Sequence, residues 1–146
     1  MKNILLTLVA GLAVWSLSAA ELNWTTDLAK AEAAAKKDNK LVLLDFTGSD
    51  WCPWCIKFEK EVLSTDEFAK YAQANLELVM VDFPRSKAQT DELKQANKSL
   101  KDKYKIEGFP TYVVLNTEGK EIGRQVGYEK GGPKVFIKQL DGFKSK

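Results

Sequence analysis

The chain has 146 residues, of which 45% are hydrophobic and 29% charged, and its 22 Lys and Arg against 20 Asp and Glu give a net charge of +2. This near balance argues against a nucleic-acid-binding protein, which needs a clustered basic face. The lysines between residues 98 and 105 are interpreted as one solvated helix face rather than a binding patch.

The N-terminal segment has the features of a secretory signal peptide. Lys2 precedes an uncharged apolar stretch at residues 4–17, and small residues follow at 18–20. The stretch is shorter than the roughly 20 apolar residues of a comfortable membrane span. We therefore expect residues 1–20 to be a signal peptide, cleaved after Ala20, with an uncleaved anchor as the alternative. The mature protein, residues 21–146, is expected to be one domain in the periplasm or outside the cell.

The hydrophobic pattern alternates between helical and strand periods and predicts an α/β fold. In chain order it first indicates a helix from a cap at 25–27 to about 37, a strand at 41–46 and a helix at 52–63. A further helix, with a capping box of Ser64 and Glu67, runs to about 74 and is followed by a strand at 76–83 and a helix at 91–104. Two strands at 111–115 and 121–127, joined by a turn, and a helix from Pro133 complete the chain. The first two strands are apolar on both faces, as central strands are. We expect a four-stranded mixed sheet with helices on both faces, plus the N-terminal helix.

The two cysteines, Cys52 and Cys55, lie at the expected start of the second helix, and several kinds of site use such a pair. A c-type haem needs a histidine after the second cysteine, where this chain has Ile56, and the chain contains no histidine. A zinc site needs four ligands, and this chain offers only two thiolates plus carboxylates, so a metal would be held mainly by a dimer that shares four sulfurs. A structural disulfide across so short a loop constrains the unfolded chain little. A redox-active pair with no metal and no bound cofactor is the preferred interpretation.

The position of each cysteine indicates its role. Cys52 is the predicted nucleophile, because unpaired N–H groups at a helix N-terminus stabilise a thiolate. Cys55 lies one turn later on the inner side and is the predicted resolving thiol. Asp45 lies at the end of an apolar strand that is expected to be buried, where a carboxylic acid destabilises the fold and is therefore expected to have a function. We predict that it exchanges a proton with Cys55, with a partly exposed strand-end aspartate as the alternative.

Apolar residues near the sulfurs are candidates for substrate binding. Trp51, Pro53 and Trp54 flank the cysteines, and Trp54 is hard to bury on a first helical turn. Phe109 and Pro110 precede a strand, and a cis bond before Pro110 leaves the preceding carbonyl and amide available to an extended substrate chain. These five residues are the predicted substrate-contact surface, although Trp51 also fits the core.

Two stretches resemble the thioredoxin superfamily, specifically its exported thioredoxin-like proteins. LVLLDFTGSDWCPWC is similar to the family's strand, loop and active site, and YKIEGFPTYVVLNTEGKEIGRQVGY to its cis-proline strand, hairpin and closing glycine. With the flanking helices, the resemblance covers residues 22–143. It implies a thioredoxin fold, a dithiol/disulfide site at Cys52 and Cys55, a cis bond before Pro110 and a buried proton-transfer acid at Asp45.

The chain departs from thioredoxin near the cysteines. The loop before Cys52 looks one residue longer, and Pro53–Trp54 replaces Gly-Pro, so the reducing potential of thioredoxin does not carry over. We expect a monomeric thiol-disulfide oxidoreductase that acts on exported cysteine-containing proteins. The sequence does not determine whether it reduces, oxidises or isomerises their disulfides. A reductase in that compartment needs a donor, and the resemblance suggests a membrane-embedded dithiol protein. The alternative is a binding module or chaperone with a permanently closed disulfide.

Overall fold

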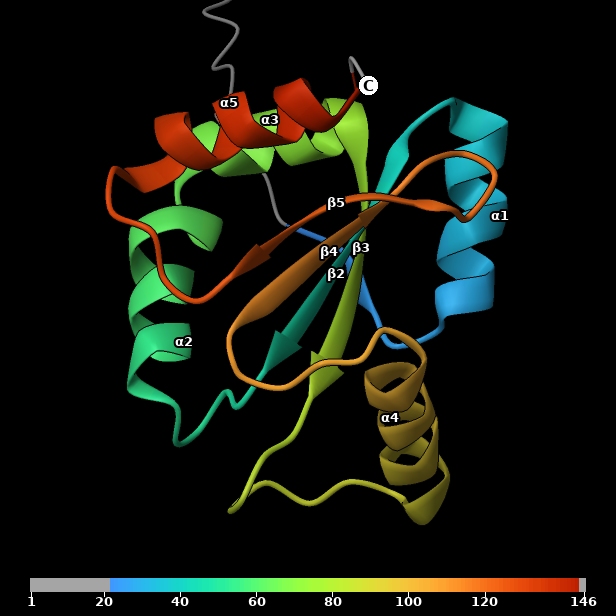
Figure 1. Ribbon diagram of the computed structural model, residues 1–146, viewed down its shortest axis with the longest axis vertical. Helices are drawn as coiled ribbons and strands as arrows, with labels where there is room; N and C mark the ends of the chain where they lie inside the picture. The colour runs from blue at the N-terminus through green and yellow to red at the C-terminus, as the bar shows by residue number, and fades with distance from the viewer. Residues whose placement is uncertain (1–21, 145–146) are drawn as a thin grey trace, which may run out of the picture.

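The computed structural model describes residues 22–144, which form a mixed sheet of five strands in the order β1-β3-β2-β4-β5 (Figure 1). The elements are β1 (Trp24–Thr25), α1 (Leu28–Asp38), β2 (Leu41–Thr47), α2 (Pro53–Phe58), the π-helical turn η1 (Glu59–Leu63), α3 (Asp66–Asn75), β3 (Leu76–Asp82), α4 (Asp91–Lys103), β4 (Thr111–Leu115), β5 (Glu121–Val126) and α5 (Gly132–Lys144). The thioredoxin fold is confirmed. The expected number of four strands was one too few, because β1 has only two residues and no periodic pattern. No helix within residues 22–144 is long and apolar enough to cross a membrane.

The predicted signal peptide, residues 1–20, lies outside the described residues, so its cleavage after Ala20 stays a prediction. The described part begins in the stretch that leads into β1, which pairs in parallel with the edge of β3. The predicted domain of residues 21–146 is therefore described almost in full.

Strand β2 is the centre of the sheet, and every one of its residues is buried. It runs parallel to β3, from Leu41 opposite Leu76 to Thr47 opposite Asp82. It runs antiparallel to β4 on its other side. Its continuous apolar sequence is explained by this position, because both faces of the strand are covered by helices.

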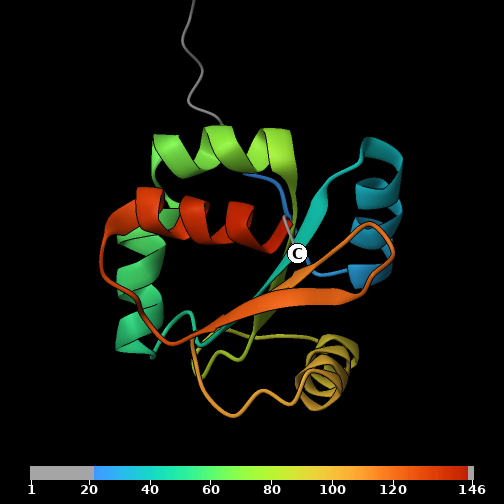
Figure 2. The same cartoon turned by 45° about the horizontal axis from the view of Figure 1, so that its top comes forward.

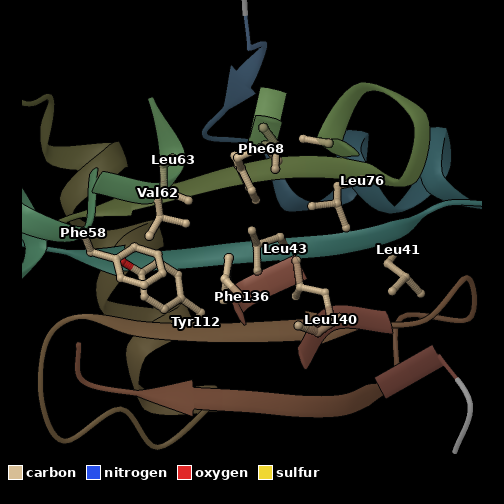
Figure 3. Packing of buried hydrophobic residues seen from close by; sticks show 13 residues of the cluster. Leu41, Leu43, Phe58, Val62, Leu63, Phe68, Leu76, Tyr112, Phe136 and Leu140 are labelled. Carbon is tan, nitrogen blue, oxygen red and sulfur yellow. The ribbon is translucent and has the colours of Figure 1, made fainter. Parts of the chain in front are cut away.

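One face of the sheet lies under α2, η1, α3 and α5, with α3 and α5 side by side (Figure 2). Figure 3 shows the core beneath them, in which Phe58 at the end of α2 packs on Tyr112 and Phe136. The ring centroids are 4.5 Å apart for Phe58 and Tyr112 and 5.1 Å apart for Phe58 and Phe136. Aromatic pairs of this kind add about 0.5–1.5 kcal/mol beyond the burial of apolar area. They fix the helix that carries the cysteines to the sheet.

The opposite face of the sheet is covered by α1 and α4. Val42, Leu44 and Phe46 of β2 point to this side, where they meet Ala31 and Ala35 of α1. The two alanines are almost fully buried, and their small side chains allow α1 to lie close to the sheet.

The predicted helix at 52–63 is present but changes its hydrogen-bonding pattern at Glu59, where η1 begins. The predicted capping box of Ser64 and Glu67 is wrong. The N-terminal cap of α3 is Thr65, whose hydroxyl accepts from the N–H of Phe68 at 3.3 Å. The reason is that Ser64 still closes the π-helical turn, its N–H donating to the carbonyl of Glu59 at 2.8 Å.

Candidate active site

Cys52 and Cys55 are joined by a disulfide at the N-terminal end of α2, with their Cα atoms 5.2 Å apart. Cys52 is the N-terminal cap of the helix, and its Sγ accepts a hydrogen bond from the N–H of Cys55 at 3.3 Å. Pro53 opens the first turn, where an N–H has no helical partner to lose. Both cysteines are largely covered in this disulfide state, with exposed fractions of 4% and 3%.

Asp45 lies inside the sheet, paired with Met80 of β3 and Tyr112 of β4. Only 3% of the residue is exposed, and within the described part of the chain its Oδ1 has no hydrogen-bond partner. Burial raises the pKa of Asp45 well above its ordinary value, and the negative charges of Glu59 and Asp82 raise it further. The buried, uncharged state is therefore the favoured one.

A pocket of about 310 Å³ connects Asp45 with the cysteine pair, because both Asp45 and Cys55 line it. Its other lining residues are Thr47, Ser49, Ile56, Glu59, Met80, Asp82 and Lys87. A space of this volume with polar lining groups is large enough to admit water. The predicted partners for proton exchange, Asp45 and Cys55, therefore line one pocket.

Trp51 and Phe109 come together beside the active-site loop. Their rings meet edge to face with centroids 6.1 Å apart, and Phe109 also stacks on Phe83 at 5.1 Å. The indole Nε1 of Trp51 donates to the carbonyl of Phe83 at 2.8 Å. Gly48 makes room for the indole, because a Cβ at this position would lie 2.5 Å from the ring. Trp51 is thus partly buried, with its ring in contact with Phe109, hydrogen-bonded to Phe83 and packed over Gly48.

Trp54 belongs to a different group of side chains and is 55% exposed. Its ring stacks on Tyr128 with centroids 5.4 Å apart, and the Nζ of Lys57 lies 5.7 Å from the Trp54 ring and 4.9 Å from the Tyr128 ring. The phenol of Tyr128 donates a hydrogen bond to the carboxylate of Glu61. The aromatic residues of the site therefore form two walls: Trp51 with Phe109, both of them predicted contact residues, and the predicted Trp54 with Tyr128, which was not predicted.

The peptide bond between Phe109 and Pro110 is cis. Pro110 itself is buried, and its carbonyl accepts from the N–H of Gly127 at 2.8 Å. Gly127 follows the last residue of β5 and precedes Tyr128. Of the predicted contact residues, Pro53 and Trp54 are exposed and Trp51 and Phe109 are partly exposed, whereas the Pro110 side chain has little surface to offer.

Residues 28–144 match the family model described as a thioredoxin-like domain. The chain belongs to this thioredoxin-like family. It is 41% identical to "Disulfide bond reductase DsbH" of Chlamydia pneumoniae over 85% of this chain and 74% of that protein. It is 35% identical to "Thioredoxin-related protein DsbJ" of the same organism, over 95% of this chain but only 43% of that protein. A solved structure, "DsbH Oxidoreductase", superposes with a TM-score of 0.80 at 38% identity and covers 92% of this chain and 94% of its own.

Family, fold and the CxxC pair together make this thioredoxin-like protein a thiol-disulfide oxidoreductase. Residues 22–144 contain no group of three or more Cys, Asp, Glu or His side chains arranged to hold a metal ion. The cysteines are engaged with each other instead.

Two residues of the site carry no role in the sequence analysis. Glu59 lines the pocket and acts on the pKa of Asp45; its spacing of four residues from Cys55 on the same helix was the available signal. Tyr128 supports Trp54 across a gap of more than seventy residues, and its only signal was its place after the closing Gly127.

Proposed function

We propose that this thioredoxin-like protein reduces disulfide bonds in exported cysteine-containing proteins, with Cys52 as nucleophile and Cys55 as resolving thiol. The observation that carries the proposal is the Cys52–Cys55 disulfide at the start of α2, with Cys55 and the buried Asp45 lining one pocket. The reductive direction is supported by the similarity to a protein called a disulfide bond reductase.

In the first step, the thiolate of Cys52 attacks one sulfur of the substrate disulfide. The substrate S–S bond breaks, a mixed disulfide forms on Cys52, and the other substrate sulfur leaves as a thiolate that takes up a proton. The N–H of Cys55, directed at the Sγ of Cys52, favours the charged form of the nucleophile.

In the second step, Cys55 loses its proton and attacks the Sγ of Cys52. The mixed disulfide breaks, the second substrate thiol is released, and the Cys52–Cys55 disulfide closes. The substrate has gained two electrons and the protein has lost two. Asp45 gives its proton to Cys55 when the pair is reduced and, then ionised, takes it back in this step through the shared pocket; its raised pKa favours the uptake.

Substrate contact is assigned to Trp51, Pro53, Trp54, Phe109 and Pro110. The exposed ring of Trp54 and the partly exposed rings of Trp51 and Phe109 offer apolar surface beside the sulfurs. An extended substrate segment pairs with the backbone before Pro110, in the manner of an added strand. The buried side chain of Pro110 limits its role to the backbone.

The electrons come from outside the protein, because each turnover leaves Cys52 and Cys55 oxidised. We assign this supply to a membrane-embedded dithiol protein that exchanges with the same pair, without a bound cofactor. The features of residues 1–20 support export and cleavage near Ala20. The mature protein is proposed to act as a monomer.

A second candidate is a binding module that keeps its disulfide closed. The observation that favours it is the burial of both sulfurs beside an exposed aromatic surface. Steady-state reduction of a protein disulfide, such as that of insulin, with dithiothreitol as electron source separates the two. A reductase accelerates the reaction in proportion to its concentration. A binding module binds the substrate but leaves the rate at that of dithiothreitol alone, and this outcome would contradict the proposal.

A further inference from the structure

Asp50, two residues before Cys52, joins the active-site loop to the loop between β3 and α4. Its carboxylate accepts hydrogen bonds from three consecutive backbone N–H groups: Arg85 at 2.9 Å, Ser86 at 2.7 Å and Lys87 at 3.1 Å. These bonds to Arg85 and Ser86 lower the pKa of Asp50. The carboxylate is therefore charged at neutral pH, and bonds to a charged acceptor are roughly twice as strong as neutral ones.

The three hydrogen bonds to the Asp50 carboxylate are called the Asp50 clasp. The clasp places Arg85 against the wall formed by Trp51 and Phe109. The guanidinium of Arg85 lies 3.9 Å from the centre of the Trp51 ring, on which it packs. Trp51 in turn contacts Phe109, the residue before Pro110. A continuous series of contacts thus runs from the Asp50 carboxylate to the segment proposed to pair with substrate.

A neighbouring set of bonds holds the same two loops together at Ser49. Its N–H and its hydroxyl donate to the carboxylate of Asp82, at 2.9 Å and 2.5 Å, and the Nζ of Lys87 donates to its hydroxyl at 3.1 Å. The Asp50 clasp is consequently not the only support of the loop. Its removal is expected to loosen the wall without unfolding the protein.

We infer that Asp50 is a positioning residue for protein substrates: it holds Arg85, Trp51 and Phe109 as one wall beside Cys52. This inference rests on the proposed reductase function. Asp50 acts on the binding of a protein substrate and not on the sulfur chemistry, because its carboxylate is engaged by the backbone of Arg85, Ser86 and Lys87 rather than by either cysteine.

The test compares Asp50→Ala, Asp50→Asn and the control Asp91→Ala in the exported protein. Asp91 is a surface aspartate whose carboxylate pairs with Lys94 of the same helix, at 3.1 Å. For each variant, KM and kcat are measured with insulin as protein disulfide and with 5,5′-dithiobis(2-nitrobenzoate) as small disulfide, and the reduction potential is determined.

For Asp50→Ala we expect KM for insulin to rise about fivefold to tenfold, as expected for loss of charge-assisted hydrogen bonds. Its kcat, its rate with the small disulfide and its potential stay at the wild-type values. Asp50→Asn recovers part of the loss, since its amide oxygen still accepts from the loop, and Asp91→Ala matches the wild type. An unchanged KM in Asp50→Ala overturns the inference, as does an equal loss with both substrates or a shifted potential.

A second measurement keeps the clasp testable if the enzyme assay fails. In a background with Trp24 and Trp54 replaced by Phe, acrylamide quenching of fluorescence reports on Trp51 alone in the mature protein. We expect quenching to increase in Asp50→Ala and to stay unchanged in Asp91→Ala. If wild-type protein reduces neither disulfide, the proposed function falls while this comparison still decides whether Asp50 holds the wall. Equal quenching in all three proteins contradicts the inference.

Discussion

The ring of Tyr128 stacks on the ring of Trp54, with centroids 5.4 Å apart and an angle of 27° between the planes. Trp54 lies between the two cysteines, whereas Tyr128 follows the last strand of the sheet. The pair therefore gives the exposed indole a fixed orientation beside the disulfide. The hydrogen bond from the Tyr128 phenol to Glu61 anchors the other end of the tyrosine.

Replacing Tyr128 is expected to weaken substrate binding through Trp54. Tyr128→Ala removes the stacked ring, and we expect KM for a protein disulfide to rise about threefold to tenfold, which corresponds to an aromatic pair of about 0.5–1.5 kcal/mol. Tyr128→Phe retains the ring, loses only the bond to Glu61, and is expected to stay near wild type. If both variants are equally impaired, the phenol and not the stacking is what matters.

The variants Cys52→Ser and Cys55→Ser are expected to fail at different steps of the reaction. Cys52→Ser has no nucleophile and is inactive. Cys55→Ser still attacks the substrate but cannot resolve the product, so it accumulates a mixed disulfide that non-reducing electrophoresis and mass spectrometry detect. Trapping on Cys55 in the Cys52→Ser protein, at the level seen on Cys52, would reverse the assigned roles.

Asp45→Asn is expected to stabilise the protein at neutral pH. The folded-state pKa of Asp45 is raised above the unfolded-state value, so the folded protein keeps a proton that the unfolded chain releases. The free energy of unfolding therefore falls as pH rises from the unfolded pKa to the folded one. Each unit of raised pKa corresponds to about 1.4 kcal/mol.

Urea unfolding between pH 4 and pH 8, roughly the window above the ordinary aspartate pKa, checks the Asp45 prediction. In Asp45→Asn the free energy of unfolding is expected to decline less as pH rises. In the control Asp38→Asn, at an exposed position, it is expected to decline as in the wild type. The same Asp45→Asn variant is expected to release substrate from the mixed disulfide more slowly. A wild-type decline in the Asp45→Asn protein would show that Asp45 is not the group that titrates.

The aromatic core beneath α2 predicts a large effect on stability at Phe136. This residue is 2% exposed and packs on Phe58, Phe68 and Tyr112. Phe136→Ala is expected to cost about 3–5 kcal/mol of unfolding free energy, from lost burial and the cavity that remains. Val135→Ala, on an exposed position of the same helix, should stay within about 0.5 kcal/mol. Similar urea midpoints for the two variants would contradict this packing.

The sequence predicted the elements that have a strong periodic or apolar pattern. The buried strand from Leu41 and the start of α2 at the cysteines follow from such patterns, because burial on both faces selects apolar residues and Pro53 suits a first helical turn. The strand β1 was missed, since Trp24–Thr25 is too short for a period to show. The change to a π-helical turn at Glu59 was missed because helical spacing continues through it.

The sequence indicated candidate site residues where a local pattern marked them: the CxxC pair with Trp54, the acid Asp45 in an apolar strand, and Phe109–Pro110 before a strand. The stacking of Tyr128 and the clasp between Asp50 and Arg85 instead join loops that meet only in the folded chain. Side-chain contacts of this kind leave no pattern in one sequence. The pKa of Asp45 is raised first by burial, and the further rise caused by Glu59 and Asp82 arises because the fold brings these two residues near it.

The equilibrium reduction potential of the Cys52–Cys55 pair distinguishes a reductase from an oxidase, an isomerase and a binding module. The protein is equilibrated with defined glutathione or dithiothreitol ratios and followed by tryptophan fluorescence, because Trp51 and Trp54 flank the sulfurs. A reductase predicts a reversible two-electron transition near or below about −230 mV. A value between about −180 and −120 mV would indicate an oxidase or isomerase instead. A disulfide that shows no reversible transition at any ratio would contradict the enzymatic account and favour a binding module.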